Sequence, residues 1–230
     1  MSRAFHLPGI FFLFCAFVLL LLVSVSLPFL PAIDVTRVHF HDGNVATETN
    51  ESAMTQLRFG IWAYCWYDDS GNRICNPTGH GYSTTLTDFG ATSQNTVTIG
   101  SSWTRGLAVH PVAAGVSLIA LLFSLSTHVT MILLASLLSF LAATLTLIAF
   151  AIDIALYAFV KHEMGHFSDV SKTTDTAPAF WMTFVSFILL CLAGCTVCFG
   201  RRRDRMAGAT SYPVSSTKTS WADRFRFRRT

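Results

Sequence analysis

The chain has 230 residues, of which 52% are apolar and 13% are charged, and its formal net charge is +3 at pH 7. A soluble domain carries about 25% charged residues, so this composition and a mean hydropathy of +0.49 exclude the ordinary soluble class. The composition indicates an integral membrane protein, for which the bilayer is the relevant solvent.

Four apolar runs are long enough to cross a bilayer, whose hydrocarbon core of about 30 Å requires roughly 20 helical residues. We predict spans at residues 8–27, 107–125, 129–160 and 179–199, with the third extending beyond the bilayer. Residues 126–128 leave room only for a tight turn between the second and third spans. The expected fold class is all-α transmembrane, a four-helix bundle. Small residues are expected to let its helices pack closely: Ala113, Ala114, Gly115, Ala142, Ala143 and Gly194.

Basic residues predict the orientation of the chain. Nine of the sixteen Lys and Arg residues lie in the tail, residues 200–230, and cationic flanks stay in the cytosol. We therefore place the tail and residues 1–7 in the cytosol, and the loops 28–106 and 161–178 outside. Cleavage of the first span as a signal peptide stays open, and it would leave the large loop outside.

The first loop has the features of a disulfide-linked β-hairpin or small sheet. Among six cysteines, Cys65 and Cys75 are the two in an oxidising compartment, so we expect them to pair rather than remain free thiols. Aromatic and β-branched residues flank the turn-forming residues 68–72, as a hairpin requires. Asn50 begins a glycosylation sequon in the same loop.

Two family resemblances rest on this loop. Gly60-Ile61-Trp62, followed by Cys65 and Cys75, resembles the claudin superfamily signature, and Arg105 resembles the arginine that ends the first loop in that family. The tryptophan that claudins carry nearer the first span has no counterpart here. The implied architecture is a claudin-like four-span protein.

The fungal PalI family shows a more extensive resemblance. Its Phe-Gly-x-x-x-Tyr-Cys motif, Gly-Tyr pair, Thr-Arg-Gly-Leu stretch and late acidic residue of span three match residues 59–65, 81–82, 104–107 and 152–157. The loop motif comprises Phe59, Gly60, Ile61, Trp62 and Tyr64. The resemblance implies a plasma-membrane protein that helps a multi-span sensor of ambient pH reach or stay in the membrane. The tail is shorter than in some members, which weakens roles that depend on it.

The sequence His162-Glu163-Met164-Gly165-His166 is a literal H-E-x-x-H motif, which on a helix can bind zinc. A zinc hydrolase needs a water-excluding cleft, and the loop 161–178 is too small to build one. We expect an ordinary solvated helix end, with metal binding and a zinc hydrolase as the alternatives. The chain is accordingly expected to be no enzyme, to hold no metal and to need no cofactor.

Asp153 is an ionisable residue in span three, which is a functional hypothesis by default. At about 1.5 Å per residue it lies about 36 Å along the helix from Val129, near the outer interface. Three interpretations stay open: an interfacial ion pair with Arg105, simple hydration, and proton sensing. Six histidines fall at or beyond the outer face, and we expect them to be ordinary surface residues: His39, His41, His80, His110, His162 and His166.

The end of the fourth span carries two candidate modification sites and a basic cluster. Cys195 and Cys198 lie near the cytosolic interface, where S-palmitoylation is expected, or else they are small packing residues. The tail is expected to be disordered and to contact anionic lipid rather than nucleic acid, through Arg201, Arg202, Arg203 and Arg205.

The leading hypothesis is a PalI-like plasma-membrane accessory protein, whose partners are membrane lipids and a multi-span pH sensor. The alternative is a structural four-span protein of membrane microdomains or of the cell-wall interface. No oligomeric state is predicted.

Overall fold

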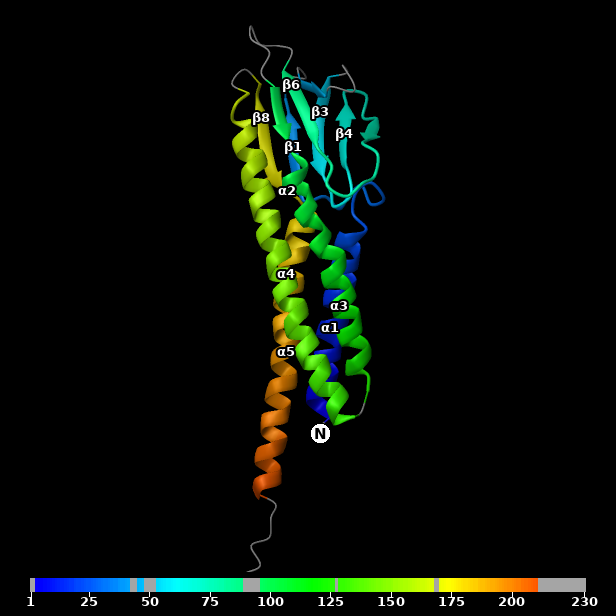
Figure 1. The fold of residues 1–230 in the computed structure, drawn as a ribbon, viewed down its shortest axis with the longest axis vertical. Helices are drawn as coiled ribbons and strands as arrows, with labels where there is room; N and C mark the ends of the chain where they lie inside the picture. Colours follow the sequence, from blue (N-terminus) through cyan, green and yellow to red (C-terminus); the bar gives the residue numbers. More distant parts are fainter. Residues whose placement is uncertain are drawn as a thin grey trace, which may run out of the picture.

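The computed structural model describes residues 3–41, 45–47, 53–88, 96–126, 128–167 and 170–210, and not the side chains of 3–6, 129 and 197–210. Figure 1 shows a long helical bundle with a β-rich head at one end. The bundle contains α1 (Arg3–Ser24), α3 (Val109–Ser124), α4 (Val129–Met164) and α5 (Pro178–Thr210). A short helix α2 (Ser101–Arg105) and a 3-10 turn η1 (Gly106–Ala108) lead into α3.

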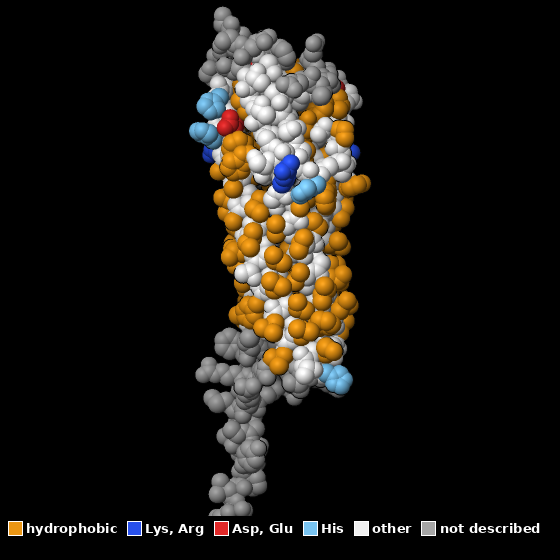
Figure 2. All heavy atoms as spheres, in the orientation of Figure 1, with side chains coloured by type: hydrophobic (Ala, Val, Ile, Leu, Met, Phe, Trp, Pro, Cys, Tyr) orange, Lys and Arg blue, Asp and Glu red, His pale blue; other side chains and the backbone are white. Residues whose placement is uncertain are grey.

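Four helical segments of the described chain are long and apolar enough to cross a membrane: Leu7–Ser24, Ser101–Ser124, Thr130–Met164 and Pro178–Thr196. Large apolar side chains lie exposed on their outer surface, and Figure 2 shows them as a broad apolar band on the face of the bundle in view. Leu137, for example, is 66% exposed. A contiguous apolar surface of this size marks contact with lipid, so the chain is a multi-pass membrane protein.

The bundle packs through small side chains. Helix α1 contacts α3 and α5, and α4 contacts α3 and α5. The predicted packing residues Ala113, Ala114, Ala142 and Ala143 are buried, and a Cβ added at Gly194 would lie 3.2 Å from the Phe140 ring. Gly115 was expected in this group, but it is exposed with nothing within 4 Å of its added Cβ. It lies on the lipid-facing side of α3.

Within the described residues, eight strands form the head, in two antiparallel sheets. The larger sheet has the order β5-β4-β3-β1-β8 and the smaller one β2-β6-β7. The strands are β1 (Thr36–Phe40), β2 (Val45–Thr47), β3 (Met54–Phe59), β4 (Tyr64–Asp68), β5 (Arg73–Cys75), β6 (Thr84–Asp88), β7 (Thr96–Ile99) and β8 (Lys172–Thr176).

The sheet differs from the prediction, which built it from the first loop alone. Strand β8 comes from the second loop and pairs antiparallel with β1, from Thr36 opposite Thr176 to Phe40 opposite Lys172. Both loops therefore contribute to one sheet. A second difference lies at the other end of the chain, where α5 continues to Thr210 and makes residues 200–210 of the predicted disordered tail helical.

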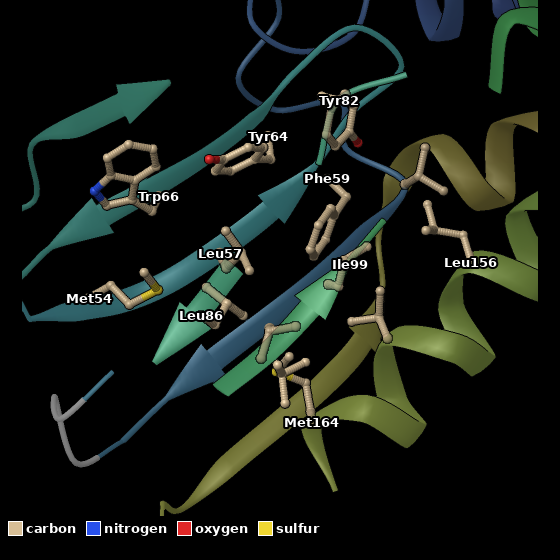
Figure 3. Close-up of a cluster of buried hydrophobic side chains, with 14 of the residues drawn as sticks. Met54, Leu57, Phe59, Tyr64, Trp66, Tyr82, Leu86, Ile99, Leu156 and Met164 are labelled. Atoms are coloured by element: carbon tan, nitrogen blue, oxygen red, sulfur yellow. The ribbon is translucent and has the colours of Figure 1, made fainter. Parts of the chain in front are cut away.

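One hydrophobic core joins both sheets to the upper end of α4. Phe59 and Leu57 of β3 contribute to it, Leu86 and Ile99 come from the smaller sheet, and Leu156 comes from α4. Figure 3 shows these side chains converging between the strands and the helix. Helix α4 is continuous from the bundle into this core, and it therefore connects the head rigidly to the spans.

Candidate functional site: the junction of head and spans

The disulfide between Cys65 and Cys75 is confirmed. The two residues are directly opposite one another in the β4–β5 ladder, so the bond crosses the hairpin. The turn between these strands contains Gly71 at φ 79°, a left-handed conformation that glycine adopts without a Cβ clash. Asp68 accepts hydrogen bonds from the Asn72 backbone (2.7 Å) and side chain (3.0 Å), which lower the pKa of the Asp68 carboxyl.

The loop motif attaches the sheet to the end of span one. The Ile61 backbone N–H donates to Ser26 Oγ at 3.0 Å, and the Trp62 indole N–H donates to the Ser24 carbonyl at 2.7 Å. Gly60 packs so closely that a Cβ there would overlap Leu27 Cβ. These three consecutive residues therefore fasten β3 and β4 to the exit of α1.

Tyr82 and Thr104 connect the same point to span two. The Tyr82 hydroxyl donates to the Gly60 carbonyl at 2.7 Å, and Thr104 Oγ1 donates to the Tyr82 carbonyl at 2.6 Å. Complete burial raises the pKa of Tyr82, so its hydroxyl remains a donor. Gly81 has φ 71°, and a Cβ there would lie 2.5 Å from Cγ of Arg105. The aliphatic part of the Arg105 side chain thus packs directly on Gly81.

Aromatic packing completes the motif on both sides. Tyr64 lies between Trp66 and Tyr82, with ring centroids 5.8 and 5.7 Å away. At the start of span two, Trp103 stacks on Phe159 of α4 with centroids 4.2 Å apart. The first contacts join β4 to Tyr82, and the second joins α2 to α4.

Span three reaches this junction through Ile152. A Cβ added at Gly106 would lie 3.1 Å from Ile152 Cγ2, so the glycine of the Thr-Arg-Gly-Leu stretch lets α4 approach η1 closely. Span four arrives through the backbone, where the Ala179 N–H donates to the Asp34 carbonyl at 3.0 Å and the Ala177 N–H to the Val35 carbonyl at 3.2 Å. All four spans therefore meet the head at this junction.

Asp153 does not pair with Arg105 and does not lie at a hydrated interface, so two of the three interpretations left open for it are contradicted. Its carboxylate Oδ2 lies 3.2 Å from His110 Nε2, and both side chains are fully buried. Arg105 is exposed and its stem lies against Gly81. The position of Asp153 along α4, estimated from the rise per residue, is close to the start of span two. However, the side of span two that faces Asp153 carries His110 and not Arg105.

The hydrogen bonds define the protons of the His110–Asp153 pair. His110 Nδ1 lies 2.9 Å from the Leu107 carbonyl, which only accepts, so Nδ1 carries a proton. One further proton is needed between Nε2 and Oδ2, whether it resides on the imidazole or on the carboxyl. The pair is net neutral in either form, which suits a site inside the bundle. Thr183 of α5 lies 3.4 Å from the same Nε2.

A group of arginines holds the segment between α1 and β1 against the sheet. Arg37 forms a two-pronged ion pair with Asp34 at 2.7 and 3.0 Å, and this hydrogen bonding raises the pKa of Arg37. Arg58 donates to the Pro31 carbonyl at 2.8 Å, and its guanidinium lies 4.5 Å from the centroid of the Tyr67 ring. The segment linking span one to the head is therefore fixed by charge as well as by packing.

The remaining predicted site residues are spread over the molecule. Cys195 is a free, exposed cysteine on α5. His162, Glu163 and His166 lie together at the end of α4. Asn50 is outside the described residues, as are the side chains of Cys198 and of the four basic residues expected to face lipid, Arg201, Arg202, Arg203 and Arg205.

The expectation that His110 is an ordinary surface residue is wrong, because its side chain is fully buried against Asp153. Ser24, Ser26 and Thr183 were also missed as junction residues. His110 carried the available signal, because an ionisable side chain inside an apolar span needs a buried partner. The hydroxyls carried none, since serine and threonine also satisfy themselves within a helix.

A disulfide-closed β-rich head on four apolar helices defines a claudin-like four-span membrane protein. The SUR7/PalI family matches residues 5–195, and the chain belongs to this family. None of the curated proteins matches it.

Proposed function

We propose that the chain is a PalI-like accessory protein of the plasma membrane, which supports the localisation or stability of a multi-span sensor in the ambient-pH response. Membership of the SUR7/PalI family supports a role of this kind. The observation that carries the proposal is the junction, in which the residues of the PalI pattern converge: residues 59–65, 81–82, 104–107 and 152–157.

The junction supports an accessory role because it makes the head and the spans one body. A partner that packs against the lipid-facing belt and a partner that binds the head are presented with surfaces in a constant relative position. Holding two surfaces in fixed register lowers the ordering cost of binding. A protein built in this way assists another membrane protein by contact and needs no reaction of its own.

The proposed orientation has the head outside the cell and both termini in the cytosol. The disulfide of the head fits an oxidising compartment, and the basic residues after span four fit a cytosolic flank. An engineered glycosylation sequon in the exposed turn at 69–72 tests this. Glycan addition there is expected, and an unmodified turn in a protein that reaches the cell surface would reverse the orientation.

Cys195 is proposed as an S-acylation site, because it is free and exposed near the end of the fourth candidate span. Cys198 and the basic residues that follow are proposed as its neighbours at the lipid surface. Hydroxylamine-sensitive acyl labelling is expected in the wild type and reduced in Cys195→Ser. Equal labelling of the variant would place the lipid elsewhere.

The second candidate is a structural four-span protein of membrane microdomains or the cell-wall interface, with which membership of the SUR7/PalI family is also compatible. Deleting the gene and measuring growth at alkaline pH separates the two. The accessory role predicts poor alkaline growth that the wild-type gene restores. Normal alkaline growth together with disturbed membrane domains would establish the structural role instead.

A further inference from the structure

Three potential metal ligands meet at the end of α4 that lies in the head. One donor atom each from His162, Glu163 and His166 can be chosen so that all lie within 4.8 Å of one another. The two imidazole rings are edge-on, with centroids 5.4 Å apart. Both histidines are exposed and Glu163 is half-buried, so an ion can reach the group from solvent.

We infer that His162, Glu163 and His166 form a zinc-binding site. Two imidazoles and one carboxylate are ligands that Zn²⁺ prefers, at about 2.0–2.2 Å. Ligand atoms of a tetrahedral ion lie roughly 3.3 Å apart, which follows from those bond lengths. The three donors therefore need to draw together by about 1.5 Å at most, which side-chain torsions supply without movement of the backbone.

The backbone that carries these ligands is held in place from the inside. Met164 directly follows Glu163, Phe167 directly follows His166, and both are fully buried in the core of the head. The turn after the helix is closed by hydrogen bonds from the Gly165 N–H to the His162 carbonyl at 2.9 Å and from the His166 N–H to the Glu163 carbonyl at 3.1 Å. The site is consequently preorganised on a rigid support, which metal binding requires.

Gly165 is required for this turn. A Cβ there would lie 2.8 Å from the His162 carbonyl oxygen, which is closer than Cβ atoms tolerate. Gly165 is thus the residue that lets His166 fold back toward His162.

Two lysines in this part of the chain contact groups other than the three ligands. The Lys161 ammonium lies 5.7 Å from the centroid of the Tyr157 ring, and the Lys172 ammonium donates to the Phe167 and Val170 carbonyls. Neither lysine contact involves the Glu163 carboxylate. The C-terminal end of α4 adds a partial negative charge at the same place.

The site binds a metal without catalysing a hydrolysis. With Glu163 as a ligand, the motif has no carboxylate left to act as the base. A bound zinc ion instead joins the last turn of α4 to His166, two residues beyond the end of the helix, and β8 begins at Lys172. Zinc is expected to stabilise the junction of α4 with the sheet. The site does not depend on the proposed function.

The test uses the purified full chain in detergent micelles, titrated with Zn²⁺ and with Co²⁺ as a spectroscopic probe. One saturable Co²⁺ per chain with visible d–d absorption is expected, and Zn²⁺ should displace it and raise the Tm. His166→Ala and Glu163→Gln are each expected to weaken the affinity by about 10- to 100-fold, because each removes one of three ligands.

The matched control is His80→Ala, which removes another exposed histidine of the head and is expected to bind as the wild type does. Glu163→Gln keeps the shape of the side chain, so it tests the ligand even if His166→Ala alters the fold. The inference is overturned if no saturable binding occurs below about 100 µM metal, about −5.5 kcal/mol. Equal binding by the wild type and both ligand variants would also overturn it.

Discussion

The head and the helix bundle bury very different side chains. The core of the head is built from large residues such as Phe59, Leu57 and Met54. Among the described residues, the bundle core contains four leucines and seven alanines. The alanines are Ala16, Ala113, Ala114, Ala120, Ala142, Ala143 and Ala193. The head excludes water, so each large apolar side chain stabilises it by burial. The bundle lies in lipid, where burying a leucine gains little and close approach of the helices decides stability.

The junction lies where these two regimes meet, and it uses the devices of both. Glycines permit close approach on the membrane side, at Gly60 and Gly106. Hydrogen bonds to serine and backbone carbonyls satisfy the polar groups of the head. Substitutions that remove side-chain volume are therefore expected to destabilise the head. Substitutions that add side-chain volume are expected to destabilise the contacts between the head and the spans.

The largest effect is expected from Phe59→Ala. Phe59 is 0% exposed at the centre of the head core, so the change should destabilise the head by about 3–5 kcal/mol. Thermal unfolding in detergent measures it. The control is Phe29→Ala, because Phe29 is 67% exposed and its loss should change little. Equal effects of the two would remove the distinction between the core and the lipid-facing surface.

Loss of the disulfide comes next. Cys65→Ser and Cys75→Ser should each cost about 2–4 kcal/mol, because the bridge restricts the unfolded loop. Both single variants are expected to show the same defect in cell-surface expression, and the double variant should be no worse. Additive effects would mean that the two cysteines do not act as partners.

Gly60→Ala tests the close approach of the head to span one. The added methyl overlaps Leu27, and overpacking of this kind costs about 1–3 kcal/mol. Gly79→Ala is the matched control in the same loop, because nothing lies within 4 Å of its added Cβ. If both changes reduce the Tm equally, the effect belongs to the loss of glycine and not to the junction.

The buried pair of the bundle should show a coupling energy of about 0.5–3 kcal/mol between His110 and Asp153. A double-mutant cycle with His110→Ala and Asp153→Ala measures it in detergent. The cycle with Arg105→Ala in place of His110→Ala is expected to show no coupling, since Arg105 lies elsewhere. Coupling to Arg105 alone would restore the pairing predicted from sequence.

The smallest effect concerns the pH dependence of the head. Burial, with a further contribution from the nearby Arg37, lowers the pKa of His39 from its ordinary 6.5. The unfolded chain therefore binds more protons near pH 6, and the head loses this part of its stability as the pH falls below about 6.5. His39→Gln should flatten the slope of Tm between pH 7 and 5. An unchanged slope would assign it to other groups.

The four spans and the disulfide could be predicted from sequence because both depend on local signals: run length, and the compartment of two cysteines. Strand β8 could not, because Lys172-Thr173-Thr174-Asp175-Thr176 has no apolar alternation and becomes a strand only by pairing with β1. The loop motif was found, but its role was not, since its partners Ser24 and Ser26 belong to a different element. The position of Asp153 along the bundle axis could be estimated from residue count. Which side of α3 faces Asp153, and therefore whether His110 or Arg105 is its partner, could not be predicted from residue spacing.

The most direct test of the accessory role is the cell-surface abundance of the multi-span pH sensor, measured with and without this chain. We expect the abundance to fall severalfold when the gene is deleted, and to return with the wild type and with Gly79→Ala. Gly60→Ala, which disturbs the junction, should restore less even when its own surface level is matched. An unchanged abundance of the sensor in the deletion would contradict the proposed function.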